Sequence, residues 1–344
     1  MKNSQNSYWS NIHKIIFLKC VDLKFIYEFF YKWIRTSCII LKNLRNDSKK
    51  YNIHFLSILY NTLFKYPLLG FLPIDFFCYR LYDNNYKDYI SNIEFYSKIT
   101  RKSSYFSYLI DNKYIFKKAV KDKIKISSLI AYYDKDKDIL KKFVEPTNNK
   151  IVIKPAKGYW GNDIKIVNSD NYIETLKKSK ESSIAEEYIY QHHLINEIFS
   201  GCVNTLRIIT YNKNGDFILI KGTLKVGQNP NLNVDNVSKG GIGINLNLKT
   251  GVLGNGYTSY NYGLNEYKSH PISKYHFFGE TIPYLEEVKD LAISAHRCFP
   301  MVKIVGWDIA ITETGPIIVE GNIYPNITGM QIHEPLRKKL LNLS

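Results

Sequence analysis

The chain has 344 residues and a formal net charge of +16, and 45% of its residues are hydrophobic. This length allows two or three subdomains with a sizeable core, and the charge favours acidic partners such as nucleotides, anionic polymers or a membrane surface. No zinc-finger, basic-zipper or aromatic RNA-binding signature accompanies the charge, so sequence-specific nucleic-acid binding is not expected. Five scattered cysteines without a C-x-x-C pair argue against a disulfide framework and favour a cytoplasmic location.

The first part of the chain, residues 1–104, differs from the rest. It contains one glycine, Gly70, and many aromatic residues at helical spacing, so we predict an N-terminal helical region. Its most apolar stretch, Phe55–Phe77, contains Lys65, Asp75 and two prolines, which makes it a poor transmembrane helix. A pair of core helices is favoured. The alternative is peripheral contact of this basic region with the inner face of a membrane.

Helices and strands alternate in residues 105–190, which we interpret as a first sheet-bearing lobe. Asp111–Lys123 is predicted as a helix that begins at an Asp or Asn cap. The other elements predicted for this lobe are strands at Ile151–Lys154, Asp163–Val167 and Ser183–Ile189 and a helix at Asn171–Lys180.

Two segments of this lobe carry candidate nucleotide ligands. Lys154 stands at a strand end, before a loop with Gly158 and Gly161, where an ammonium group and backbone N–H groups could approach phosphate oxygens. The segment Glu186-Glu187-Tyr188-Ile189 offers carboxylates for a ribose or an adenine amino group, and backbone groups for the base edge. Taken alone, each segment also suits an ordinary turn or an acidic strand end.

Residues 191–344 are interpreted as a second lobe. Its expected elements are strands at Thr205–Tyr211 and Phe217–Val226, a helix at Pro283–Phe299 and a hairpin at Gly306–Asn322. Because hairpins make the sheets at least partly antiparallel, the predicted fold class is α+β. The adjacent pair His192 and His193 is expected in a solvated loop.

The first hairpin of this lobe is predicted to have one basic face. If its turn is centred near Asn214, Arg207 faces Lys221. The residues predicted to share this face are Thr205, Arg207, Lys221, Thr223 and Lys225. Three cations on one face repel each other unless an anionic group lies over them, and a triphosphate or a substrate carboxylate would suit. A solvated basic face is the alternative.

The second hairpin carries a candidate metal site. With its turn centred on Thr314, Asp308 lies opposite Glu320, and Asn322 points to the same face as Glu320. Like charges placed opposite each other repel, and a cation between them would remove that repulsion. Two carboxylates and an amide oxygen are hard ligands of the kind that hold Mg²⁺ beside phosphates. An ordinary exposed hairpin face is the alternative.

In this order, the segments resemble the ATP-grasp superfamily. The nearest resemblance is to its sugar-transfer-associated branch, which is related to carboxylate–amine ligases of the α-L-glutamate ligase type. The resemblance covers roughly residues 105–335. The segments that carry it are Ile151–Pro155, Glu186–Ile189, Asn204–Arg207, Asp235-Asn236 with Gly240-Gly241, Gly306–Ile309 and Val319–Asn322.

The resemblance implies a fold with two α+β lobes that enclose a nucleotide, and it implies roles for the residues of these segments. ATP would be bound by Lys113, Lys154, Gly158, Gly161, Glu186, Glu187, Tyr188, Ile189, Lys221 and Asn236. Arg207 would hold phosphate or the acyl intermediate, with Lys225 where relatives often have arginine. Mg²⁺ would be bound by Asp308, Glu320 and Asn322.

The implied reaction is ATP- and Mg²⁺-dependent ligation. A carboxylate attacks the γ-phosphate of ATP, and an amine or similar acceptor then displaces phosphate from the acyl phosphate. Small-molecule or glycan-linked carboxylates and amines are the expected substrates, within cell-surface polysaccharide assembly. The alternatives are an ATP-grasp kinase that phosphorylates a sugar and a non-catalytic nucleotide-binding scaffold.

Overall fold

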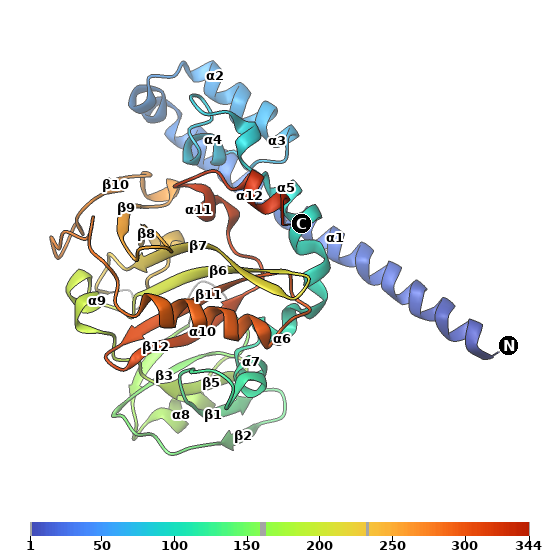
Figure 1. The fold of residues 1–344 in the computed structure, drawn as a ribbon, viewed down its shortest axis with the longest axis vertical. Helices are drawn as coiled ribbons and strands as arrows, with labels where there is room; N and C mark the ends of the chain where they lie inside the picture. The colour runs from blue at the N-terminus through green and yellow to red at the C-terminus, as the bar shows by residue number, and fades with distance from the viewer. Residues whose placement is uncertain (1, 159–162, 232–233, 344) are drawn as a thin grey trace. The chain divides into compact units, whose positions relative to one another are not determined.

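A computed structural model describes residues 2–158, 163–231 and 234–343 (Figure 1). The chain divides into two compact units. One combines Met1–Ser104 with Met330–Ser344, and the other is Tyr105–Gly329. The segment after Gly329, which the sequence analysis assigned to the second lobe, is thus grouped with the N-terminal helical region.

The first unit is helical. Its helices are α1 (Lys2–Tyr51), α2 (Phe55–Tyr60), α3 (Tyr66–Leu68), α4 (Asp75–Cys78), α5 (Asn92–Phe95) and α12 (Arg337–Leu341), with α11 (Ile327–Gln331) at the boundary in sequence. The buried Gln331 side chain joins the two pieces of the unit, because it accepts a hydrogen bond from the Ile90 N–H and donates to the Ile90 carbonyl and the Tyr79 hydroxyl. Among the described residues, no helix has the length and apolar character needed to cross a membrane.

The second unit contains a five-stranded antiparallel sheet of order β2-β1-β5-β3-β4. Its strands are β1 (Leu129–Asp134), β2 (Ile139–Lys142), β3 (Lys150–Pro155), β4 (Lys165–Asn168) and β5 (Ser183–Glu187), with α6 (Ser107–Asp111) and α7 (Lys113–Val120) before it and α8 (Tyr172–Lys177) against it. The sequence predicted an Asp or Asn cap for this helix, and the capping residue of α7 is Asn112. Its side chain accepts hydrogen bonds from backbone N–H groups in the first turn.

The second sheet has seven antiparallel strands in the order β10-β9-β8-β7-β6-β11-β12. Its strands are β6 (Thr205–Lys213), β7 (Asp216–Val226), β8 (Ile242–Leu246), β9 (Leu253–Tyr257), β10 (Glu266–Tyr267), β11 (Ile304–Thr312) and β12 (Gly315–Asn322). Helix α10 (Leu285–Arg297) lies across one face of this sheet (Figure 1), and α9 (His193–Ile198) precedes β6. The predicted α+β class, with two sheets and an N-terminal helical region, is confirmed.

Two hairpins of this sheet set the positions of the candidate residues. In β11–β12, Asp308 pairs with Glu320 as predicted, across a register shift next to Ile309. In β6–β7, the prediction that Arg207 faces Lys221 is wrong. A shift between Ile209 and Thr210 pairs Arg207 with Thr223. The parity of the strands is unchanged, so the predicted residues still share a face.

The core beneath the second sheet contains a buried polar chain. The Trp307 indole N–H donates to the Thr210 hydroxyl, which lies 2.7 Å from Nδ1 of His296. Nε2 of His296 lies 2.9 Å from the Val302 carbonyl, so Nε2 carries the proton and Nδ1 accepts from Thr210. Burial lowers the pKa of His296 to about 4.

Candidate active site

Arg207 and Asp308 form the centre of the candidate site. They lie on the adjacent strands β6 and β11 and pair directly in register. The Arg207 guanidinium donates to both carboxylate oxygens, at 2.6 and 2.9 Å. Lys225 on β7 adds a third contact to Asp308, at 3.1 Å. Two of the three cations predicted on the basic face therefore converge on one carboxylate.

The charges of this group determine one another's protonation. Burial by itself raises the pKa of Asp308, but Arg207 and Lys225 outweigh it and hold that pKa well below its usual range. Burial lowers the pKa of Lys225, yet Asp235 and Asp308 together raise it above its usual value. The group is therefore ionised at neutral pH.

Asp235 belongs to this group and was not among the predicted site residues. Its carboxylate accepts hydrogen bonds from the Thr205 N–H and hydroxyl, and it lies 3.4 Å from the Lys225 ammonium. The sequence did contain a signal, since Asp235 is adjacent to the predicted Asn236. Asn236 itself caps a short helical turn, where its side chain accepts from the Ser238 N–H and hydroxyl.

The three predicted metal ligands adjoin at the end of the β11–β12 hairpin. Asp308 faces Glu320 across the strands, and the Asn322 amide lies 3.5 Å from a Glu320 carboxylate oxygen. Glu320 is about one-third exposed, and the Lys113 ammonium lies 3.7 Å from it. Asp308 is buried, so the alternative of an exposed hairpin face does not apply to it.

This donor set fits a hard divalent cation such as Mg²⁺. Carboxylate and amide oxygens are its preferred protein ligands. Glu320 and Asn322 are the accessible pair, whereas both oxygens of Asp308 already contact Arg207 and Lys225. A cation would therefore be held mainly by Glu320 and Asn322, with Asp308 shared.

A second charged group lies beneath the five-stranded sheet. Glu186 on β5 forms ion pairs with Lys154 on β3 and with Lys117 on α7, and all three side chains are buried. Burial raises the pKa of Glu186, but the two ammonium groups overcome this and lower it to about 2. Lys117 also donates to the carbonyl and hydroxyl of Ser127.

Lys117 is the residue of this group that the sequence analysis missed. The signal was its spacing, because residues four apart lie on one face of a helix and Lys113 was already a candidate. Lys113 begins α7, and Lys117 lies in its last turn. Lys113 donates to the Gly158 carbonyl at 2.8 Å and approaches Glu320, so α7 carries cations toward both charged groups.

The two adjacent glutamates have different surroundings. Glu186 faces the lysines, whereas Glu187 accepts hydrogen bonds from the Thr147 N–H and hydroxyl and from the Asn148 amide. Tyr188 and Ile189 follow the strand, and both are partly exposed. The structure therefore brings Glu186, and not Glu187, to the predicted phosphate-binding Lys154.

The remaining predicted residues lie at the edges of the site. Gly158 helps to line a hollow that is too small as it stands for a nucleotide, which would require it to widen. Its lining is Ile110, Asp111, Lys113, Gly158, Glu320, Gly321 and Asn322. Gly161 falls outside the described residues. Lys221 is buried and donates to the Asn245 side chain.

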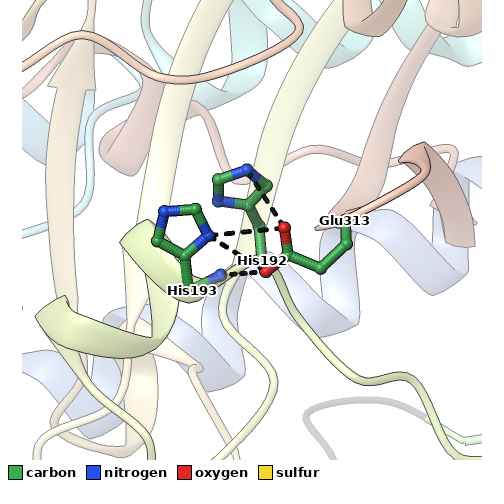
Figure 2. A group of neighbouring side chains, drawn as sticks. All are labelled: His192, His193 and Glu313. Carbon is green, nitrogen blue, oxygen red and sulfur yellow. Dashed lines mark hydrogen bonds and ion pairs between the residues drawn. The ribbon is translucent and has the colours of Figure 1, made fainter.

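A separate cluster joins His192 and His193 to Glu313 in the turn of the second hairpin (Figure 2). The expectation of a solvated loop fails for His192, which is buried. Its Nδ1 accepts the Leu194 N–H, which leaves the proton on Nε2, 3.6 Å from Glu313. The Glu313 carboxylate also accepts from the His193 N–H at 2.7 Å. The start of α9 is therefore held to the β11–β12 turn by N–H groups of His192 and His193 that point to the Glu313 carboxylate.

The model of the sugar-transfer associated ATP-grasp family matches residues 172–344. No curated protein matches significantly. The protein is similar to N5-carboxyaminoimidazole ribonucleotide synthetase from Thermotoga maritima, with 15% identity, 71% of this chain and 52% of that one covered, and a TM-score of 0.41.

Two further solved structures are similar at the same level. D-alanine–D-alanine ligase from Helicobacter pylori has 16% identity, with 68% of this chain and 60% of that one covered and a TM-score of 0.41. L-amino acid ligase from Bacillus licheniformis has 11% identity, 64% and 42% coverage, and a TM-score of 0.40. The chain spans about half the length of these proteins. The family match covers half of the chain, and the chain belongs to the sugar-transfer associated ATP-grasp family.

Proposed function

We propose that this protein is an ATP- and Mg²⁺-dependent ligase that activates a carboxylate as an acyl phosphate for attack by an amine or similar acceptor. The observation that carries the proposal is the convergence of Arg207 and Lys225 on Asp308, beside the accessible oxygens of Glu320 and Asn322. Cations and hard oxygen ligands on one strand surface suit a polyphosphate and its metal ion.

Each group has a role in this proposal. Lys154 and Lys113 would bind phosphate oxygens, and Glu186 would hold Lys154 in place. Glu320 and Asn322, with Asp308 shared, would hold Mg²⁺, which would neutralise charge on the phosphates when bound. Arg207 and Lys225 would stabilise the negative charge that develops on the transferring phosphoryl group. The acceptor's attack then requires no covalent protein nucleophile.

The cellular setting we propose is cell-surface polysaccharide assembly. This part rests on the family's association with sugar transfer and on no residue of the site. A deletion strain whose surface glycans, measured by mass spectrometry, keep every amide-linked substituent would contradict this setting while leaving the ligase chemistry open.

The chemistry is tested with the purified full chain, ATP, Mg²⁺ and pools of carboxylates and amines. We expect ADP and phosphate release that requires both pools, together with a condensed product in the mass spectrum. Asp308→Asn and Glu320→Gln should abolish release, while Glu286→Gln, the same change at an exposed helix position, should not.

Other outcomes separate the alternatives. A phosphorylated sugar without condensation would identify a kinase. Calorimetric ATP binding with no turnover across the pools would identify a scaffold. Full turnover by either Asp308→Asn or Glu320→Gln would refute the assignment of the metal site.

A further inference from the structure

Helix α1 carries an exposed apolar surface in addition to its packed face. Phe29 and Ile40 are buried in the helical unit, and Phe25 stacks on Tyr96 with ring centroids 3.7 Å apart. On another face, seven large apolar side chains are 47–71% exposed. This set, the α1 stripe, consists of Leu23, Ile26, Tyr27, Phe30, Tyr31, Ile34 and Leu41.

The spacing of the α1 stripe makes it continuous. Its members follow Leu23 by 3, 4, 7, 8, 11 and 18 residues, a helical pattern that places them along one side of α1. From Leu23 to Leu41 the stripe extends about 27 Å at 1.5 Å per residue. Contiguous exposed apolar surface of this kind marks an interaction site, whereas single exposed apolar residues do not.

Cations flank the α1 stripe. Residues 22–51 contain seven basic and three acidic residues. Lys24, Arg35 and Lys42 are separated by 11 and 7 residues, close to whole helical turns, so they form one line along the helix. Of the acidic residues, Asp22 is paired with Arg101 and Asp47 is buried, so Glu28 is the acidic residue left on the exposed flank, against the three cations of this line.

A second exposed apolar row lies in the same unit. Leu56, Tyr60, Phe64 and Leu68 follow each other at intervals of four residues through α2, a π-helical turn (Asn61–Lys65) and α3. All four are 58–87% exposed. The helical unit therefore presents two amphipathic elements, each with a wide apolar side.

We propose that the helical unit docks on an anionic membrane surface through the α1 stripe, with the helix lying in the plane of the interface. Apolar side chains would enter the headgroup region while Lys24, Arg35 and Lys42 contact lipid phosphates. Tyrosines such as Tyr27 and Tyr31 suit the boundary between headgroups and acyl chains. A second copy of the chain is disfavoured as the occupant, because two such stripes face to face would bring like charges together.

The experiment is flotation of the full-length protein with two kinds of vesicle, phosphatidylcholine alone and phosphatidylcholine with about 30% phosphatidylglycerol. The wild type should float with the anionic vesicles only, and 0.5 M salt should weaken its binding. Phe30→Ser/Ile34→Ser and Arg35→Glu/Lys42→Glu should each lower the partition coefficient by roughly tenfold or more.

Matched controls come from the other unit. Ile272 is as exposed as Ile34, at 53% against 55%, and Phe278 is also exposed, so Ile272→Ser/Phe278→Ser is compared with Phe30→Ser/Ile34→Ser. Lys177→Glu/Lys249→Glu changes the net charge as much as the α1 charge variant does. Neither control should change flotation, and all variants should keep the unfolding midpoint of the wild type.

Three results would overturn the proposal. The first is failure of the wild type to float. The second is flotation of Phe30→Ser/Ile34→Ser like the wild type. The third is a dimer, detected by light scattering, that this double variant dissociates, because the stripe would then bind a second copy. None of these outcomes depends on ATP turnover, so they are distinguishable from a failure of the proposed ligase chemistry.

Discussion

The guanidinium of Arg207 donates to both carboxylate oxygens of Asp308 across the adjacent strands β6 and β11. The Asp308 carboxylate is almost fully buried, so its charge depends on Arg207 and Lys225 for compensation. Removing one partner of such a pair leaves a buried charge without adequate solvation, and that cost usually exceeds the net benefit of the pair.

We therefore expect Arg207→Ala to lower the free energy of unfolding by about 3–5 kcal/mol. Arg207→Lys should lower the free energy of unfolding by less, because it keeps the positive charge and loses only the bidentate contact with Asp308. Urea unfolding at pH 7 measures both. Arg297→Ala, at an exposed position of α10, is the control and should change stability by less than about 0.5 kcal/mol. An equally small effect of Arg207→Ala would contradict the pairing.

Glu186 should steepen the acid-unfolding profile, together with Asp308, whose pKa is also lowered. The pKa of Glu186 is lowered to about 2 in the fold, against 4.5 for an ordinary glutamate. Between pH 4.5 and 2 this side chain therefore binds a proton in the unfolded chain but not in the folded one. Its contribution, on the order of 3 kcal/mol, is present above pH 4.5 and is lost as the pH falls toward 2. Glu186→Gln should be less stable at pH 7 and show a flatter slope from pH 4.5 to 2. Glu174→Gln, which breaks an exposed and solvent-screened ion pair, should change the slope much less than Glu186→Gln does.

The register of the two hairpins shows what the sequence could predict. In β11–β12, the tight turn pairs Thr312 with Gly315, and a bulge beside Ile309 then shifts the strands by one residue. A turn centred on Thr314 predicts the same pairing that the tight turn and the bulge together produce beyond Ile309. Asp308 was therefore correctly placed opposite Glu320. In β6–β7, the Asn214-Gly215 turn and a bulge shift the pairing by two residues, which moved the partner of Arg207 while its face stayed the same.

The missed residues have a common physical reason. Lys117 and Asp235 act through tertiary contacts, with Glu186 on a distant strand and with Thr205 and Lys225 on another hairpin. Local patterns fix which face of a helix or strand a side chain occupies, but they do not say which lysine of a helix meets which carboxylate of a sheet. Burial of Lys117 was hidden for the same reason, because lysine is usually exposed.

His296 should make the protein less stable in mild acid. Its pKa of about 4 in the fold lies below its ordinary 6.5, so the unfolded chain takes up the proton first as the pH falls. The contribution, about 3 kcal/mol, is complete above pH 6.5 and is lost as the pH approaches 4. Unfolding by urea at half-unit steps from pH 7.5 to 4 measures the slope. His270 is also buried with a lowered pKa and adds to it, so His296→Gln should reduce the slope without removing it.

Loss of the Thr210 hydroxyl should lower the free energy of unfolding by more than the removal of one small polar group usually does. The hydroxyl accepts from the Trp307 indole and donates to His296, so Thr210→Val leaves two buried polar atoms without a partner. At about 1–3 kcal/mol for each unsatisfied group, we expect a loss of roughly 2–6 kcal/mol in the free energy of unfolding. Thr210→Ser keeps the hydroxyl and should lose much less. Equal losses for the two variants would assign the effect to packing instead.

The cluster of His192, His193 and Glu313 should not behave as a zinc site. A ligand nitrogen must be free of its proton, and Nε2 of His192 bears one because Nδ1 accepts the Leu194 N–H. We expect a tenfold molar excess of Zn²⁺ to leave the thermal midpoint unchanged, whereas Glu313→Gln should lower it by weakening the contacts to both imidazoles and to the His193 N–H. Glu266→Gln, also in an exposed side-chain contact, is the control. A zinc-dependent rise in the midpoint that disappears in both Glu313→Gln and His193→Ala would show that the metal displaces these protons and that the cluster binds it.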